Sequence, residues 1–296
     1  MVLHHSKRLF RKLKIISFYF VLSILTIELL SLINDSINES CYIDVAKSWY
    51  LIPTFIITGI IAGIVDSIAG GGGLVTVPVL LGVGLPPQLA LGTNKFQSSF
   101  GSFTAATNYV KNKIVPIKDC YSGILLTVMG ALTGTWALQQ IDTQILKTII
   151  PVLLIIIAVY TLVSPEIGVK DKKAKLPLFF FYLIFGISLG FYDGFFGPGV
   201  GSFWVIAFIL FSGFNMTKAT GYTKVMNFTS NMTSLCVFYF YNHISFSIGL
   251  CMACGQVIGA RIGSNLVIAK GNRFIKPIFI AVITATTIKL LCEWGI

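Results

Sequence analysis

The sequence predicts an all-α polytopic membrane protein built from two inverted-topology repeats, each a broken helical hairpin plus three transmembrane helices, with an extra N-terminal transmembrane helix. Three observations predict this fold. Of the 296 residues, 55% are hydrophobic and 11% are charged, whereas a soluble domain carries about 25% charged residues. Two of the apolar stretches are interrupted by glycine-rich breaks. Residues in and around the first break have counterparts in the second half of the chain at a nearly constant spacing.

The N-terminal region predicts a retained transmembrane helix. Residues 4–14 are rich in lysine and arginine, and an apolar stretch over 15–33 follows, interrupted by Glu28. Because no small-residue cleavage site comes next, we interpret residues 13–33 as a helix that is kept, with its basic end in the cytoplasm. Residues 1–50 then form a basic N-terminus, this helix and an external loop.

Residues 51–83 predict the first broken hairpin. An apolar stretch over 51–69 ends in Gly70 to Gly73, and a second apolar stretch over 74–83 follows. Consecutive glycines break a helix, and the second stretch is shorter than the about 20 residues that cross a bilayer. We therefore expect two arms of about 16 residues that reach about 24 Å into the membrane and leave on the side where they entered.

The rest of the chain repeats this plan. The first repeat, 51–163, continues with three transmembrane stretches, and a basic cytoplasmic linker, 164–175, leads to the second repeat, 176–296. The predicted stretches are 88–110, 120–138 and 145–163 in the first repeat, then 176–196 and 200–213 around the second break, followed by 217–241, 246–264 and 275–292.

Matching residues in the two halves indicate an internal duplication. The offset is 127 residues between Asp66 and Asp193 and 129 residues between Lys95 and Lys224. It is 125 residues between Gly130 and Gly255, and Gly134 matches Gly259 in the same way.

The charges of equivalent loops predict that the halves are inverted. The loop 111–118 carries three lysines, but its counterpart 242–245 carries no lysine or arginine; the next loops reverse this bias, since 139–147 has one basic residue and 265–276 has three. Basic loops stay in the cytoplasm, so the halves have opposite orientations, as in many secondary transporters. The expected location is the bacterial cytoplasmic (inner) membrane.

The glycine breaks are candidate binding elements. Backbone without helical hydrogen bonds is tolerated at membrane depth where it lines a polar cavity, and the N-terminus of a short helix attracts anions. Close helix packing by small residues is the alternative. The candidate ligands from the breaks are Gly70, Gly71, Gly72, Gly73, Gly197, Gly199 and Gly201.

Two lysines at matched positions suggest a shared wet cavity. Lys95 and Lys224 lie several residues inside apolar segments, where a lone lysine is costly. Snorkelling to the nearby interface is the alternative, but both segments are rich in polar side chains, which favours the cavity. The candidate ligands around the lysines are Thr93, Asn94, Gln97, Ser98, Thr223 and Asn227.

The aspartates that precede the breaks have three candidate roles. Asp66 and Asp193 could pair with Lys224 and Lys95, cap the short helices, or carry a coupling proton. Pairing or capping, a structural role, is favoured over proton coupling.

The sequence also lacks the motifs that are typical of enzymes, metal-binding proteins and nucleic-acid-binding proteins. The basic residues lie in loops and form no face for nucleic acid, the six cysteines are scattered, and no catalytic set, metal-ligand set or phosphate-binding loop is found. We expect no enzyme activity, no metal and no cofactor, so transport must run on gradients.

Five stretches carry a resemblance to a known family: AGIVDSIAGGGGLVTVP, GLPPQLALGTNKFQSS, GFYDGFFGPGVGSF, TKATGYTKVMN and GARIGSNLVIAKG. Over about residues 51–292 the chain resembles the TauE/SafE family of bacterial membrane transporters, which includes proteins assigned to export of sulfite and small organosulfur acids. It looks most like the branch known as probable membrane transporters, and residues 1–50 have no counterpart there. The family motifs map to Asp66, Gly70 to Gly73, Thr93 to Lys95, Asp193, Gly197 to Gly201, Thr223 and Lys224.

We therefore expect a secondary transporter that exports a small anion of the sulfite or organosulfonate class through a midplane site between the hairpins. The alternative is a gradient-driven carrier of a cation or neutral solute that uses Asp66 and Asp193 as ligands. The expected partners are a small anionic solute and the lipid bilayer, without nucleic acid, and the sequence leaves open whether the chain forms a homo-oligomer.

Overall fold

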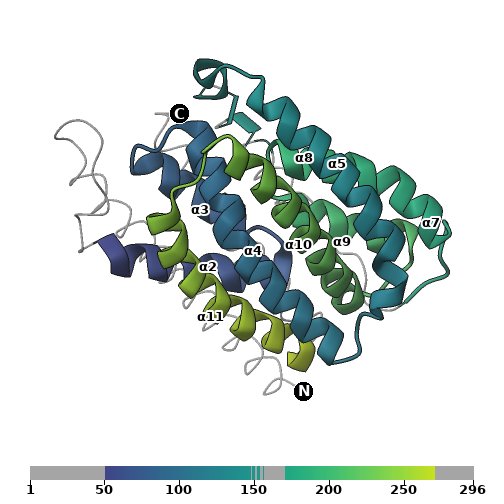
Figure 1. The fold of residues 1–296 in the computed structure, drawn as a ribbon. Helices are drawn as coiled ribbons and strands as arrows, with labels where there is room; N and C mark the ends of the chain where they lie inside the picture. Colours follow the sequence, from purple (N-terminus) through teal and green to yellow (C-terminus); the bar gives the residue numbers. More distant parts are fainter. Residues whose placement is uncertain (1–50, 148, 151, 154–155, 157–170, 271–296) are drawn as a thin grey trace, which may run out of the picture.

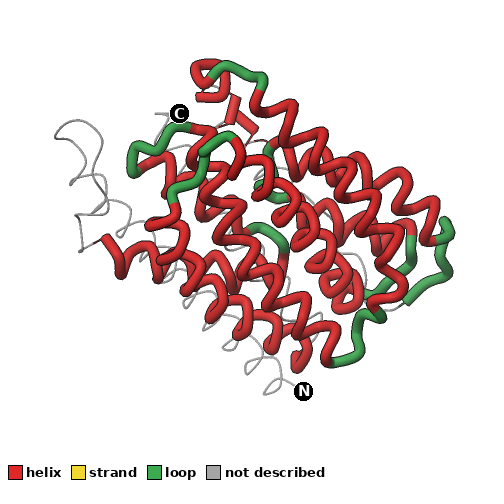
Figure 2. The backbone as a smooth tube through the Cα atoms, viewed as in Figure 1, coloured by secondary structure: helices red, strands yellow, loops and turns green. Residues whose placement is uncertain are grey.

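The computed structural model describes residues 51–147, 149–150, 152–153, 156 and 171–270, and they form a bundle of helices (Figure 1). All regular structure in this part of the chain is helical, and short loops join the helices (Figure 2). The prediction of an all-α protein is thus confirmed for the described residues. The predicted helix at 13–33 and the stretch 275–292 lie outside them, and 145–163 lies largely outside.

The first broken hairpin is formed by α2 (Leu51–Ala69) and α3 (Gly72–Gly82). Leu51 and Phe55, near the start of α2, share an apolar cluster with Val79, near the end of α3, so the two arms run antiparallel. The arms have 19 and 11 residues, so the expectation of two equal arms is wrong. The helix continues past the carboxylate and ends where the glycines begin.

The second broken hairpin has a first arm in three helical parts and a short second arm. The backbone N–H of Leu176, just before the first arm, donates to the carbonyl of Phe211 at the end of the second arm, and the rings of Tyr192 and Phe203, nearer the break, have centroids 5.5 Å apart, so these arms are also antiparallel. The first arm contains a π-helical turn that α2 lacks. Its parts are α7 (Leu178–Phe181), the π-helix η2 (Tyr182–Gly186) and α8 (Ile187–Phe195), and the second arm is α9 (Val200–Phe211).

The remaining helices surround the hairpins. α4 and α10 pack against each other in the centre (Figure 1), α11 packs on α2 and α4, and α5 packs on α8 and α10. The hairpin of each half thus lies against a helix of the other half. The bounds are α4 (Pro87–Lys111), η1 (Ile117–Cys120), α5 (Tyr121–Gln139), α10 (Met216–Phe240) and α11 (Phe246–Lys270).

The matched glycines of the repeat lie in these crossed helix contacts. A Cβ on Gly255 or Gly259 would collide with a backbone carbonyl oxygen of α2, and a Cβ on Gly130 or Gly134 would collide with one of α8. Small residues let helix backbones approach closely in a membrane. The glycines therefore set the close packing of α11 on α2 and of α5 on α8.

The bundle exposes large apolar side chains, as suits a membrane protein, and buries polar side chains of its two central helices among apolar clusters. Large apolar side chains such as Phe103, Trp136 and Phe240 are exposed, while most polar side chains of α4 and α10 are buried. Within the described residues, four helical segments are long and apolar enough to cross a membrane: Leu51–Ile68, Ile117–Gln139, Leu178–Phe195 and Phe246–Lys270. α3 and α9 are apolar but shorter.

Candidate functional site

The two glycine breaks meet inside the bundle. Gly70 has a φ of +80°, which favours glycine, and a Cβ on it would overlap the Cα atom of Gly201. A Cβ on Gly73 would lie 3.1 Å from the Cα atom of Pro198. The tips of the two hairpins therefore touch backbone to backbone, at a place where no larger residue fits.

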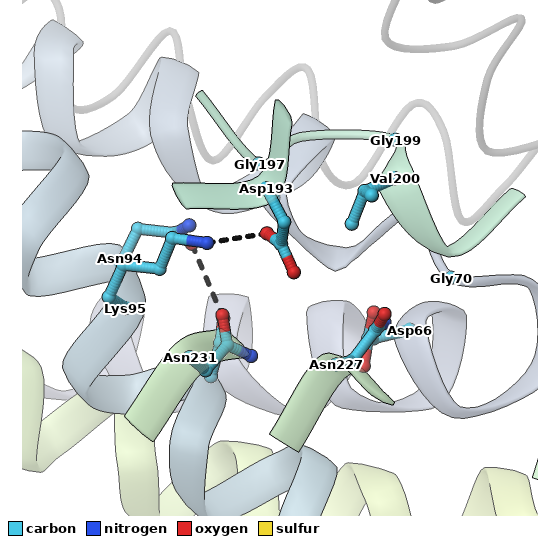
Figure 3. Close-up of a pocket in the computed structure, with 12 residues that line it drawn as sticks. Asp66, Gly70, Asn94, Lys95, Asp193, Gly197, Gly199, Val200, Asn227 and Asn231 are labelled. Carbon is cyan, nitrogen blue, oxygen red and sulfur yellow. Dashed lines mark hydrogen bonds and ion pairs between the residues drawn. The ribbon is translucent and has the colours of Figure 1, made fainter. Parts of the chain in front are cut away.

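Two ion pairs join the halves beside this contact. The Nζ atom of Lys95 on α4 lies 2.5 Å from Oδ1 of Asp193 on α8, as Figure 3 shows, and Nζ of Lys224 on α10 lies 3.0 Å from Oδ2 of Asp66 on α2. Each lysine thus pairs with the aspartate of the other half. The N-caps of α3 and α9 are Gly71 and Gly199, and neither helix start receives a side-chain cap. The aspartates pair and do not cap.

A small polar cavity is lined by Lys95 and Asp193 of the first ion pair and by Asp66 of the second (Figure 3). Its volume is about 20 Å³, which is room for about one water molecule. The cavity in this conformation is therefore closed around less space than an anion of four or more heavy atoms needs. It is lined by Asp66, Gly70, Gly73, Asn94, Lys95, Ser98, Asp193, Gly197, Gly199, Val200, Asn227 and Asn231.

Hydrogen bonds hold one wall of the cavity. Oδ1 of Asn94 accepts from the hydroxyl of Thr76 on α3, at 2.5 Å, and from Nε2 of Gln97, at 2.9 Å. This fixes the amide of Asn94 between α3 and α4. On the opposite wall Asn227 is buried, and within the described part of the chain its Oδ1 has no hydrogen-bond partner. That amide has an unused acceptor in the cavity wall.

The structure brings most of the predicted site residues together, but not all. The predicted residues that line the cavity are Gly70, Gly73, Asn94, Lys95, Ser98, Gly197, Gly199, Asn227 and both aspartates. Lys224 adjoins the cavity through its pair with Asp66, and Gln97 through Asn94. Gly71, Gly72 and Gly201 lie in the breaks without lining it.

Two predicted residues point elsewhere. The hydroxyl of Thr93 accepts a hydrogen bond from the backbone N–H of Ser245, in the loop between α10 and α11. The hydroxyl of Thr223 donates to the carbonyl of Ala219 one turn earlier in α10. Neither side chain lines the cavity, because Lys95 follows Thr93 by two residues and Lys224 follows Thr223 by one, and residues at these spacings lie on different faces of a helix.

The sequence prediction left out four residues of this region. Val200 and Asn231 line the cavity, Ser230 donates a hydrogen bond to Oδ2 of Asp193, and Gln256 of α11 packs against Gly101 of α4. Asn231 and Ser230 belong to the polar segment of Lys224, which was a usable signal. The lone amide of Gln256 in an apolar stretch was a weaker one.

The charges of the site cancel in this conformation. Two ammonium groups face two carboxylates, so a solute anion that binds a lysine has to take the place of an aspartate. Within the described ranges, no group of three or more His, Cys, Asp or Glu residues could hold a metal ion.

A comparison with protein families identifies the chain. The family model described as sulfite exporter TauE/SafE matches residues 55–290. The chain belongs to the TauE/SafE family. The match spans both glycine breaks and all four residues of the ion pairs. No solved structure matches the chain.

Relatives of this TauE/SafE chain are named as transporters. It is 39% identical over 243 residues to the probable membrane transporter protein YfcA of Escherichia coli K12, covering 82% of this chain and 90% of that protein. It is 39% identical over 237 residues to a probable membrane transporter protein of Haemophilus influenzae, covering 80% and 93%. It is 40% identical over 246 residues to the probable membrane transporter protein ORF9 of a Sinorhizobium species, covering 83% and 94%. The chain is therefore a membrane transporter and not an enzyme.

Proposed function

We propose that this transporter is a gradient-driven carrier that exports small anions of the sulfite or organosulfonate class and binds them at Lys95 and Lys224. The observation that carries the proposal is the pair of crossed ion pairs beside the cavity between the two broken hairpins. Two buried ammonium groups are costly in a membrane. Their placement beside the N-termini of α3 and α9 gives an anion both the charge of the lysines and the positive ends of two helices.

Binding then requires an exchange of partners. An anion displaces the carboxylate from the lysine, and a proton on that carboxylate removes the repulsion between the two negative groups. Because the cavity holds about one water in the present conformation, the hairpin tips have to separate as the anion enters.

We further propose that the two halves are inverted repeats in the bacterial inner membrane. The opposite charge bias of matched loops supports this orientation, and so do the crossed contacts of α2 with α11 and of α8 with α5. Rocking of one half against the other would open the site alternately to the two sides. The direction of net transport then follows the gradients, outward when the anion accumulates in the cell.

A carrier of a cation or neutral solute is the second candidate. It is favoured by the exposure of Asp66, whose side chain is 17% exposed and lines the cavity. In that case Asp66 and Asp193 are the ligands, and the lysines are counter-charges that leave when the solute arrives.

Uptake of radiolabelled sulfite into proteoliposomes tests the two candidates. Unlabelled sulfite, thiosulfate, sulfoacetate and acetate serve as anionic competitors, and sodium and potassium as cationic ones. The double variants Lys95→Met/Asp193→Asn and Lys224→Met/Asp66→Asn remove both charges of one pair, so that no buried charge is left alone. Lys111→Met, at the exposed end of α4, is the matched control.

We expect competition by anions and a loss of uptake of about 100-fold in each double variant, since charge-assisted hydrogen bonds contribute about 1.5–3 kcal/mol each. The control should keep its uptake. Cation-dependent flux without anion competition would overturn the anion site and make the aspartates the ligands.

A further inference from the structure

The two carboxylates of the site differ in exposure. The side chain of Asp193 is 3% exposed, and the side chain of its partner Lys95 is 2% exposed. The side chain of Asp66 is 17% exposed, although that of its partner Lys224 is fully buried. Water therefore reaches the carboxylate of Asp66 more easily than that of Asp193.

The carboxylates also differ in their hydrogen bonds. Asp193 accepts from Lys95 through one oxygen and from the hydroxyl of Ser230 through the other. Within the described residues, Asp66 accepts a side-chain hydrogen bond from Lys224 alone. The carboxylate of Asp193 thus has a side-chain donor on each oxygen, whereas that of Asp66 has one side-chain donor in the described part of the chain.

One substitution between the halves explains the missing hydroxyl. On the offset that relates the two lysines, Gly101 stands where the second half has Ser230. The space beside Gly101 is filled from α11, because a Cβ on Gly101 would overlap Oε1 of Gln256. On the offset that relates Gly130 and Gly255, the counterpart of Gln256 is Ala131. The surroundings of Asp66 thus have a glycine and an amide where those of Asp193 have a serine and an alanine.

The amide of Gln256 is buried without a partner. The residue is 1% exposed, and within the described ranges neither its Oε1 nor its Nε2 has a hydrogen bond. Oε1 also lies 3.0 Å from the place of a Cβ on Gly63, which precedes Asp66 by one helical turn. A buried amide without a hydrogen bond is destabilising, and such groups call for an explanation. Here an acceptor without a partner lies beside the helical turn that precedes Asp66.

We propose that Asp66 is the residue that takes up the coupling proton, that Asp193 stays ionised as the fixed partner of Lys95, and that Gln256 stabilises protonated Asp66 as a positioning residue. This inference rests on the proposed anion-carrier function. The proton comes from water in the cavity and converts the carboxylate into a carboxylic acid, while Lys224 keeps its three N–H protons and is released to the anion. One monoanion and one proton then leave the net charge of the site unchanged.

Within the described residues, the other titratable and charged groups around Asp66 are paired or lie away from it. Asp66 is therefore the group that exchanges the proton. α3 and α9 carry no titratable side chain, and Arg261 of α11 is exposed and donates to Asn108. The titratable and charged groups that face the cavity or its walls are Lys224 on α10, Lys95 and Tyr109 on α4, and Asp193 on α8. The hydroxyl of Tyr109 donates to the carbonyl of Ser67, and both lysines are held by carboxylates.

Two measurements on the full chain test the proposal. The first follows labelled sulfite and internal pH together in proteoliposomes at several external pH values. The wild type should move one proton with each monoanion, and Asp66→Asn should move the anion without the proton and with a flat pH profile. Gln256→Leu should lower the pH midpoint of transport by about one unit, the value of one hydrogen bond. Ser230→Ala, its counterpart at Asp193, should reduce flux without moving that midpoint.

The second measurement needs no transport and so covers variants that do not carry the anion. Infrared difference spectra on acidification in the presence of sulfite should contain a carboxylic acid band that Asp66→Asn removes and Asp193→Asn keeps. Loss of the band in Asp193→Asn, or an intact band and intact proton flux in Asp66→Asn, would overturn the assignment while leaving the anion carrier standing. If the wild type moves no anion at all, the proposed function itself fails.

Discussion

The Lys95–Asp193 region and the Lys224–Asp66 region hold the same charges at matched positions, but their surroundings differ. The first is sealed, with both side chains at most 3% exposed and a serine hydroxyl on the carboxylate. The second is looser, with a carboxylate that is 17% exposed and an unpartnered amide nearby. The difference suggests that a duplicated charge pattern can keep one copy as a rigid element and adapt the other for exchange.

Removing one charge from each pair should have the largest effect. Asp193→Asn leaves Lys95 buried without a counter-charge and should cost about 3–5 kcal/mol of stability. Asp66→Asn should cost less, because water reaches that side. Unfolding in detergent, followed by circular dichroism, compares the two, and Lys95→Met/Asp193→Asn should regain most of the loss. Equal costs for the two single variants would show that the regions do not differ in burial.

The contact between the hairpin tips tests whether the two regions are mechanically joined. Gly70→Ala combines a positive φ with an overlap on Gly201 and should cost about 2–5 kcal/mol, from backbone strain and overpacking together. Gly84 has a φ of +84° and open space around it, so Gly84→Ala carries the strain alone, about 1–2 kcal/mol. The same detergent unfolding measures both. A Gly70→Ala variant as stable as Gly84→Ala would indicate that the tips are free to separate.

An exchange of surroundings should make the looser region resemble the sealed one. Gly101→Ser with Gln256→Ala gives the Asp66 region the serine and alanine of the Asp193 region. A hydroxyl on Asp66 should favour its ionised form by about 1.5 kcal/mol, which lowers sulfite flux at neutral pH about tenfold. The flux of the double variant, compared with that of Gln256→Ala alone, isolates the contribution of the hydroxyl; an unchanged flux would mean that position 101 does not act on Asp66.

The loop that contains His243 and its counterpart in the first half, 112–116, should differ slightly in how acid changes their contribution to stability. Nδ1 of His243 lies 2.7 Å from Oε1 of Gln139, and burial lowers the pKa of His243 below its usual 6.5. The folded state therefore favours the neutral ring, so this stabilisation is full above pH 6.5 and is lost as the pH falls through the lowered pKa. The counterpart loop 112–116 has no histidine.

Because the His243 ring is partly exposed, solvent screening keeps the effect small, about 1–2 °C in Tm between pH 7.5 and 5.5. His243→Gln should remove this part of the pH dependence, and a scanning fluorescence melt at the two pH values measures it. An equal acid response in wild type and variant would assign the shift to other groups.

Much of the fold was predictable from the sequence because a membrane imposes strict rules on it. Apolar length, glycine breaks and loop charge each have one main physical cause in a bilayer, so the helical character, the two breaks and the matched lysines and aspartates follow from them. The expectation of equal arms in the first hairpin was wrong because it divided residues 51–83 evenly, whereas α2 continues to Ala69, directly before the glycines, and leaves a short second arm.

The sequence by itself determined which residue types are duplicated, including Asp66, Asp193, Lys95 and Lys224, because their burial in apolar segments demands partners. The pairing of Asp66 with Lys224 and of Asp193 with Lys95 was one of three roles that the sequence left open. Only the tertiary structure showed that each lysine pairs across to the aspartate of the other half and that the aspartates cap neither short helix. It also decided that the Asp66 side is the looser one. That difference depends on side chains from three helices meeting at one point, and such a meeting leaves no pattern along a single segment.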